Sequence, residues 1–119
     1  MNIALIDDDI TSNFIHKTKI SKQYPKANIK LFNNGKEALD ELLNNKFFDY
    51  AFLDLNMPVM NGIEFLQHHK NLNKDQKIKK IILFIEQDVA NDFIAKNEIY
   101  MRLTKPLNDE KINRVFEGK

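Results

Sequence analysis

The chain has 119 residues, a length typical of one domain, and 43% of them are hydrophobic and 29% charged, as in ordinary folded proteins. Lys and Arg number 18 and Asp and Glu number 17, so the formal charge of +1 argues against a nucleic-acid site held by bulk charge. Cysteine is absent, which excludes disulfides, thiolate metal sites and thiol catalysis. Three glycines cannot form a glycine-rich loop around a nucleotide phosphate.

The first half of the chain alternates between expected strands and helices. Residues 3–6 and 50–53 are apolar at successive positions, which is typical of strands covered on both faces of a parallel sheet. Residues 27–32 alternate more, as expected for a strand nearer a sheet edge. Asp9 is the expected N-cap of the helix after the first run, and residues 35–45 carry an apolar face at helical spacing. That face consists of Ala38, Leu39, Leu42 and Leu43.

The second half continues the alternation. An apolar stripe that begins with Ile63, Phe65 and Leu66 predicts a helix ending near Leu72, and residues 81–85 form a third continuous apolar run. Asp88 is the expected cap of a short helix through Ala95, and residues 99–103 form a second alternating run. Asn108 is the expected cap of the last helix. Acidic residues occupy its first turn, where the helix dipole favours them: Asp109 and Glu110.

A strand followed by a helix, repeated about five times, predicts a doubly wound α/β fold with right-handed crossovers over residues 1–119. The chain ends soon after the last expected helix begins, so no DNA-binding or catalytic output domain is expected after it. The longest apolar runs, of about five residues, are too short for a membrane span or a signal peptide. A cytoplasmic location is therefore expected.

Charged residues follow three of the expected strands. Asp7 and Asp8 follow the first run, Asp54 follows the third, and Lys105 follows the fifth. In doubly wound sheets the working site lies beyond the carboxyl ends of the strands, so these side chains are expected to meet in one cleft. Clustered carboxylates repel unless a cation joins them, and Mg²⁺ prefers oxygen ligands. Carboxylates, Mg²⁺ and a lysine together predict a site that handles a phosphoryl group.

The chain resembles the receiver domain of a two-component response regulator, of the single-domain kind found among chemotaxis regulators. The resemblance covers essentially the whole chain. It is carried by residues 5–9 (LIDDD), 54–62 (DLNMPVMNG) and 103–106 (LTKP), in this order and at this spacing. The resemblance implies a flavodoxin-like five-stranded parallel sheet of order 2-1-3-4-5, with helices on both faces.

The resemblance also implies a role for each matching residue. Asp54 would accept a phosphoryl group from a phosphohistidine on a sensor histidine kinase or a phosphotransfer protein. Asp8 would ligate Mg²⁺, Asp7 would assist through water, and Asn56 would offer its backbone carbonyl. Lys105 would pair with the phosphoryl oxygens and precede a cis proline. By the same resemblance, Gly62 would begin the next helix, and Asn56 and Gln87 would flank the path of the hydrolytic water.

Two positions depart from the family pattern. Receivers usually carry Ser or Thr at the end of the fourth strand, and the alignment places Ile85 there. They usually carry Tyr or Phe three residues before the lysine, and this chain has Arg102. Without the hydroxyl, one hydrogen bond to the phosphoryl group is missing, worth about 1.5–3 kcal/mol. The usual relay from the cleft to a partner surface is therefore expected to respond differently or little.

Two rivals to phosphorylation-dependent signalling stay open. The first is a receiver that acts as a protein-binding module without phosphate, which the residues at positions 85 and 102 motivate. The second is an enzyme on a similar sheet, either a Mg²⁺-dependent phosphatase or a flavin carrier, although the missing glycine-rich loop argues against flavin. In the principal hypothesis the chain signals through a protein partner at the last helix and its neighbours, near Tyr100 and Arg102.

The remaining histidines and lysines have ordinary interpretations. His68 and His69 are expected at the surface, and neighbours on a helix point about 100° apart, so they do not form a metal pair. His16 has no evident partner in the sequence. A basic cluster before the fourth strand is interpreted as a solvated connection. It consists of Lys77, Lys79 and Lys80.

Overall fold

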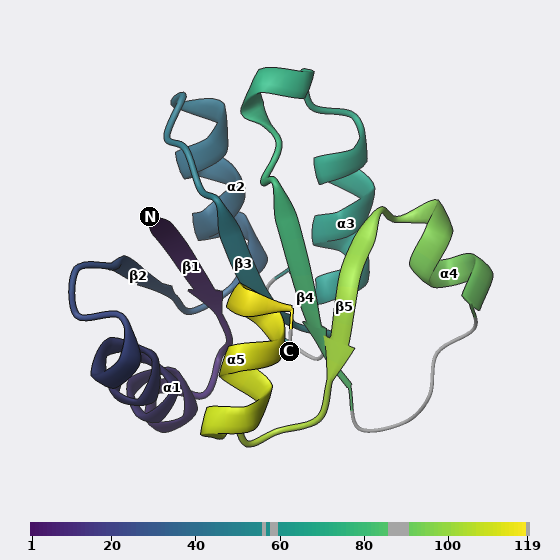
Figure 1. Ribbon diagram of the computed structural model, residues 1–119. Coiled ribbons are helices and arrows are strands. Elements are labelled where there is room, and N and C mark those ends of the chain that lie inside the picture. The colour runs from purple at the N-terminus through teal and green to yellow at the C-terminus, as the bar shows by residue number, and fades with distance from the viewer. Residues whose placement is uncertain (56, 58–59, 86–90, 119) are drawn as a thin grey trace.

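The computed structural model describes residues 1–55, 57, 60–85 and 91–118, with only the backbone of residues 91 and 92. Its centre is a five-stranded parallel sheet of order β2-β1-β3-β4-β5, as the resemblance implied (Figure 1). The strands are β1 (Asn2–Ile6), β2 (Asn28–Phe32), β3 (Tyr50–Asp54), β4 (Lys80–Phe84) and β5 (Ile99–Leu103). The helices are α1 (Ile10–Gln23), α2 (Gly35–Leu43), α3 (Gly62–Lys70), α4 (Asn91–Lys96) and α5 (Asp109–Glu117), with a 3₁₀ turn η1 (Lys74–Gln76).

The two faces of the sheet carry separate apolar clusters. Helices α1 and α5 lie on the face turned toward the viewer in Figure 1, and α2 and α3 lie behind the sheet. Along β4, Ile82 and Phe84 join the cluster under α1 and α5, whereas Ile81 and Leu83 join the cluster under α2 and α3. Successive residues of a strand point to opposite faces, so these fully covered strands require apolar residues at consecutive positions.

Helix caps account for the helix starts. The side chain of Asp9 accepts the N–H of Ser12 at 3.1 Å, and that of Asn108 accepts the N–H of Lys111 at 2.8 Å. Both residues therefore cap helices as expected. Asp88, the expected cap before α4, lies outside the described residues. Within the described part of the chain, no helix has the length and apolar character needed to cross a membrane.

Two apolar residues expected on buried helix faces are exposed. Leu43 is 52% exposed and Ile63 is 45% exposed. A helix turns about 100° per residue, so Leu43 points away from the direction of buried Leu42, and Ile63 points away from that of buried Phe65. The same helices are also shorter than expected, because α2 ends at Leu43 and α3 ends at Lys70.

The expectation that both adjacent histidines lie at the surface is wrong for His69. His68 is exposed, but His69 is only 3% exposed and its Nε2 accepts the N–H of Ile78 at 2.9 Å. Burial, with the charge of nearby Lys77 as a smaller cause, lowers the pKa of His69 to about 4. The turn between neighbouring helix residues sends one ring to solvent and the other to the core.

Candidate functional site

Three carboxylates meet at the carboxyl ends of adjacent strands. Asp7 and Asp8 follow β1, and Asp54 is the last residue of β3, which pairs with β1 in parallel. One carboxylate oxygen from each residue lies within 4.8 Å of those of the other two. This edge of the sheet is the lower one in Figure 1, where the strand arrows end. The structure therefore brings together the acids that the sequence placed at separate strand ends.

Backbone and side-chain hydrogen bonds hold Asp7 in place. It is 2% exposed, its Oδ1 accepts the N–H of Asp9 at 2.9 Å, and its own N–H donates to the carbonyl of Phe32 at 3.0 Å. The buried side-chain amide of Asn13 donates to the carbonyls of Asp7 and Phe32, at 3.0 and 3.1 Å. Asn13 was not singled out from the sequence, because one asparagine within a helix carries no signal of its distant partner on β2.

Lys105 enters this acidic cluster from the end of β5. Its Nζ forms an ion pair with Asp7 and lies 3.7 Å from Oδ2 of Asp54. Burial by itself would lower the pKa of Lys105, but the hydrogen bond and charge of Asp7, followed by the charge of Asp54, raise it above its ordinary value. The lysine is therefore a fixed cation at neutral pH. The Lys105–Pro106 peptide bond is cis, as expected.

The donor set fits a divalent cation with a preference for oxygen. Asp7 is buried, Asp8 is exposed and Asp54 is intermediate, so the cluster opens to solvent on one side. Mg²⁺ is commonly held by one or two carboxylates together with waters and phosphate oxygens, which such an open cluster allows. Asp7, Asp8 and Asp54 would hold the ion. Asn56, the fourth expected ligand, lies outside the described residues, as does Gln87.

At the end of β4, the residue beside the acids is Phe84. Asp54 and Phe84 are register partners across β3 and β4, and the Nζ of Lys105 lies 5.6 Å from the centroid of the Phe84 ring. Ile85, which the sequence places at the family's hydroxyl position, directly follows β4 and packs in the cluster on the opposite face. Neighbouring residues of a strand point to opposite faces, so Phe84 and Ile85 face different sides of the sheet. Neither side chain carries a hydroxyl.

A buried histidine packs against the ring of Phe84. The rings of His16 and Phe84 are 5.0 Å apart, and His16 is 3% exposed. The Nε2 of His16 accepts the N–H of Leu107 at 3.4 Å, and Lys19 donates to the carbonyl of Leu107 at 2.7 Å. Helix α1 thus holds the segment that follows Lys105. The sequence contained no signal for this contact, which joins residues 91 positions apart.

Arg102 lies on the edge strand β5, three residues before Lys105. It is register partner to Leu83 and is exposed, and Tyr100 on the same strand is 43% exposed. The Nζ of Lys80 lies 4.6 Å from the centroid of the Tyr100 ring. Tyr100 and Arg102 stand two residues apart, so both point to the same side of the strand.

Gly62 begins α3, as the resemblance implied, and packs against the backbone that carries Asp54. Its N–H donates to the carbonyl of Leu55 at 2.8 Å. A Cβ at this position would lie 2.6 Å from the Cα of Leu55 and 2.7 Å from the carbonyl oxygen of Asp54. Only glycine allows this approach, so the start of α3 helps to position the end of β3.

The chain is similar in sequence to known proteins. Residues 3–117 match the family model described as response regulator receiver domain. The chain is 30% identical to chemotaxis protein CheY-3 of Vibrio cholerae, over 98% of this chain and 92% of that protein. It is 24% identical to two-component response regulator 24 of Arabidopsis thaliana, over 79% of this chain, and it spans 66% of the plant protein.

The fold is also found in solved structures. A two-component response regulator from Legionella pneumophila matches with a TM-score of 0.84 and 24% sequence identity, over 98% of this chain and 95% of that one. At that identity the similarity establishes the fold, while the match to the family model spans nearly the whole sequence. The chain belongs to the response regulator receiver domain family.

Proposed function

We propose that this chain takes a phosphoryl group onto Asp54 from the phosphohistidine of a sensor histidine kinase or a phosphotransfer protein. The observation that carries the proposal is the placement of Asp54 beside the carboxylates of Asp7 and Asp8 and near the amine of Lys105. A carboxylate nucleophile, a site for a divalent cation and a fixed lysine are the parts that phosphoryl transfer needs, because its catalysis is mainly positioning and charge neutralisation.

In the proposed step, a carboxylate oxygen of Asp54 attacks phosphorus. The P–O bond of an acyl phosphate forms as the P–N bond to the donor imidazole breaks, and the imidazole leaves with the bonding electron pair. Bound Mg²⁺ would neutralise charge on the phosphoryl oxygens. Lys105 is already held near Asp54 and protonated, so it can pair with a phosphoryl oxygen with little further loss of side-chain conformational entropy. Later attack of water on phosphorus would return the Asp54 carboxylate.

The test of this proposal is chemical modification without a kinase. The protein is incubated with acetyl phosphate and Mg²⁺, and its mass is followed. The expected result is a gain of one phosphoryl group in the wild type and no gain in Asp54→Ala. Asp49→Ala provides a control, since Asp49 lies at the opposite end of β3, where it accepts the N–H of Asn2. An unmodified wild type, or equal modification of Asp54→Ala, contradicts the proposal.

A second candidate function is a protein-binding module that works without phosphate. The observation that favours it is Phe84, which occupies the end of β4 opposite Asp54 and offers no hydroxyl to a phosphoryl group. A wild type that acetyl phosphate does not modify would support this candidate. If the wild type is modified but its partner binding does not change, the proposed phosphorylation of Asp54 stands and its proposed role in signalling is contradicted.

Signalling in the principal proposal runs through a protein partner at the last helix, α5, and the neighbouring edge strand, β5. Phosphorylation adds about −1.5 to −2 charges to the cleft, and Lys105 links that cleft to the end of β5. Arg102 and Tyr100 are exposed on β5 and can contact such a partner. The comparison that tests this is partner capture by unmodified and acetyl-phosphate-treated protein, with Arg102→Ala as the variant.

A further inference from the structure

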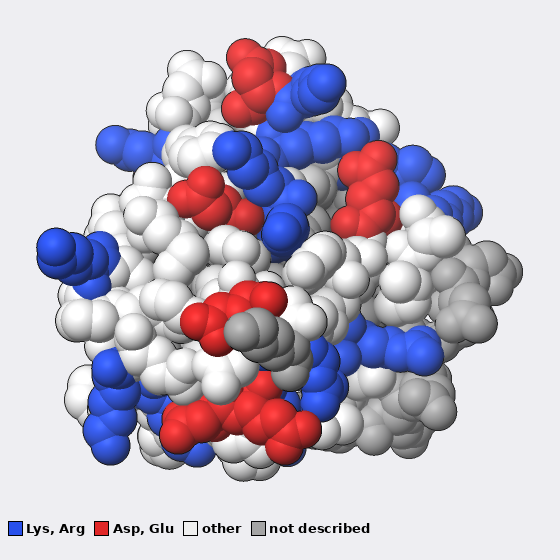
Figure 2. Space-filling model, viewed as in Figure 1, with Lys and Arg blue, Asp and Glu red and all other residues white. Residues whose placement is uncertain are grey.

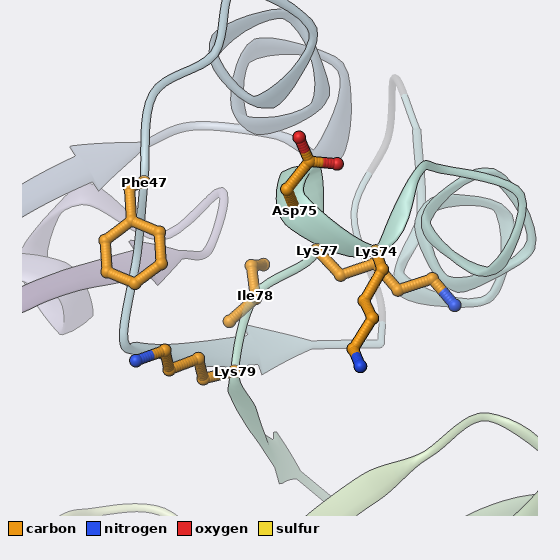
Figure 3. Close-up of a pocket in the computed structure, with 6 residues that line it drawn as sticks. All are labelled: Phe47, Lys74, Asp75, Lys77, Ile78 and Lys79. Carbon is orange, nitrogen blue, oxygen red and sulfur yellow. The ribbon is translucent and has the colours of Figure 1, made fainter.

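At the sheet edge opposite the acidic cluster lies a pocket of about 730 Å³. Figure 3 shows the side chains that line it, which come from the connection before β3, from η1 and from the residues that lead into β4. They are Phe47, Lys74, Asp75, Lys77, Ile78 and Lys79. Because β3 separates the pocket from Asp54, it is distinct from the phosphoacceptor site.

The floor of the pocket is apolar and firmly held. Ile78 is 5% exposed, and its N–H donates to the ring of buried His69. Phe47 is 42% exposed, and the residue after it, Phe48, accepts the N–H of Lys79 at 3.3 Å. The two connections are thus joined by backbone hydrogen bonding, so the floor exists before any ligand binds. A preformed apolar surface of this kind can take an apolar side chain.

Lysines surround this floor. The Nζ of Lys79 lies 5.1 Å from the centroid of the Phe47 ring, and the Nζ of Lys77 lies 3.6 Å from a carboxylate oxygen of Glu98. Three lysines and one aspartate line the pocket, which gives its lining a net charge of +2. Figure 2 shows Lys and Arg side chains grouped at the upper end of the molecule, where β3 and β4 begin in Figure 1, with Asp and Glu among them.

The lysine amines do not converge on one point. In Figure 3 the amine of Lys79 lies on the Phe47 side of Ile78, whereas the amines of Lys74 and Lys77 lie on the other side of Ile78. A compact anion such as inorganic phosphate could contact one amine at a time. An extended chain with several carboxylates can meet the amines in turn while one apolar side chain rests between Phe47 and Ile78. Electrostatic complementarity of this kind selects partners by charge.

We infer that this pocket, the Phe47–Lys79 pocket, binds an acidic segment of a partner protein that carries one aromatic or large aliphatic anchor. The pocket lies at the far end of the sheet from Asp54, so a bound partner would leave the phosphoacceptor cleft open. The chain would then have one face for phosphoryl chemistry and another that holds a partner by apolar contact and charge.

The test is titration of isotope-labelled protein with short peptides, followed by amide NMR. The probe is a peptide of Asp and Glu around one central Phe. The matched peptides replace Phe by Ser, or Asp and Glu by Ser. We expect shifts at residues 47 and 74–79 with the probe, weaker binding with either matched peptide, and loss of binding as salt concentration rises. Equal binding of the probe and the peptide without Phe overturns the inference.

Variants locate the binding surface. Joint replacement Lys74→Glu and Lys79→Glu should weaken binding of the probe by at least about tenfold, which is about 1.4 kcal/mol. Phe47→Ala should weaken it without changing the amide spectrum of the core, since Phe47 is partly exposed. Lys26→Glu, at an exposed lysine between α1 and β2, should bind as the wild type does. Full binding by the charge-reversed variant contradicts the inference.

Two further measurements exclude other occupants. Benzoate and a single-stranded oligothymidylate are titrated under the same conditions, and tighter binding of either than of the probe would show a small-anion or nucleic-acid site and overturn the inference. Asp54→Asn should bind the probe as the wild type does. Failure of phosphorylation at Asp54 would therefore leave this inference standing, and failure of peptide binding would leave the proposed phosphoryl transfer standing.

Discussion

Asp54 and Phe84 are register partners at the ends of β3 and β4, and the ring of Phe84 lies under the amine of Lys105. The last residue of β4, beside the Asp54 carboxylate, is thus a buried ring without a hydroxyl. That ring is 4% exposed and packs against His16 and Phe52. Inward movement of the β4 end toward a phosphoryl group would have to break this packing, and the ring offers no hydrogen bond in return.

Replacing Phe84 by threonine should place a hydroxyl beside Asp54. We expect beryllofluoride, a phosphoryl mimic, to cause larger amide shifts around residues 83–85 and 102 in Phe84→Thr than in the wild type. The loss of a buried ring should cost about 3–5 kcal/mol of unfolding free energy, an upper range taken from Phe→Ala replacements. NMR with and without beryllofluoride and urea unfolding measure the two effects.

Ile85→Thr is the matched control for that variant. It introduces the same hydroxyl one residue later, on the face that packs against the other apolar cluster. Its response to beryllofluoride should resemble that of the wild type. Large shifts at the β4 end in the wild type itself, or in Ile85→Thr alone, would show that Phe84 is not what limits the response.

Mg²⁺ should stabilise the native protein through the acidic cluster. An ion that binds only the folded state adds about 2.7 kcal/mol at a concentration one hundred times its dissociation constant, and it also relieves repulsion among Asp7, Asp8 and Asp54. Asp8→Asn should lose most of this gain. Asp75→Asn, an exposed acid at the opposite edge of the sheet, should keep it. Thermal unfolding with and without Mg²⁺ gives the comparison, and equal stabilisation of Asp8→Asn would place the ion elsewhere.

Acidification should destabilise the protein through buried His69. Its pKa is about 4 in the folded chain against 6.5 in the unfolded one, so the unfolded chain binds more protons between these values. The contribution of His69 is therefore complete above about pH 6.5 and is lost as the pH falls to about 4, by roughly 3 kcal/mol at most. His69→Gln keeps an acceptor for the N–H of Ile78 and cannot titrate, so its stability should fall less over this range.

His68→Gln is the control for the acid experiment, because His68 directly precedes His69 in the same helix and is exposed. Its pH profile should follow that of the wild type in urea unfolding. Some slope should remain in His69→Gln, since burial together with the charge of Lys105 also lowers the pKa of His16 to about 4. A profile for His69→Gln as steep as that of the wild type would refute the assignment to His69.

Gly62→Ala should destabilise the fold and impair modification of Asp54. The added Cβ would lie 2.6 Å from the Cα of Leu55, so the backbone next to Asp54 has to shift, at a cost of about 1–3 kcal/mol. An unhindered helix position would instead gain up to about 1 kcal/mol from the same change. Urea unfolding and acetyl-phosphate modification measure both effects.

Gly118→Ala separates backbone conformation from crowding. Gly118 has φ of 74° and no atom within 4 Å of an added Cβ, so only the left-handed conformation is penalised, by about 1–2 kcal/mol. Modification of Asp54 should be unchanged in this variant. If Gly62→Ala is as stable as the wild type and is modified at the same rate, the close contact with Leu55 does not position the end of β3.

The sequence alone determined the alternation of strands and helices and the meeting of Asp7, Asp8, Asp54 and Lys105, whereas the strand order was implied by the resemblance to receiver domains. Continuous apolar runs mark buried parallel strands, and the carboxyl ends of such strands share one edge, so residues that follow them must come together. The caps Asp9 and Asn108 were also predictable, because a cap acts on backbone only three residues away.

Tertiary structure decided which of two neighbouring side chains faces the site or the core, and which distant segments are in contact. The place of the Phe84 ring beside Asp54 follows from the register of β4 against β3, and the burial of His69 follows from the rotation of α3. The contact of His16 with Leu107 and the pocket around Phe47 join segments that no local pattern relates. The local periodicity of an element indicates which of its faces packs against the core. It does not indicate which side chains of other elements pack against that face.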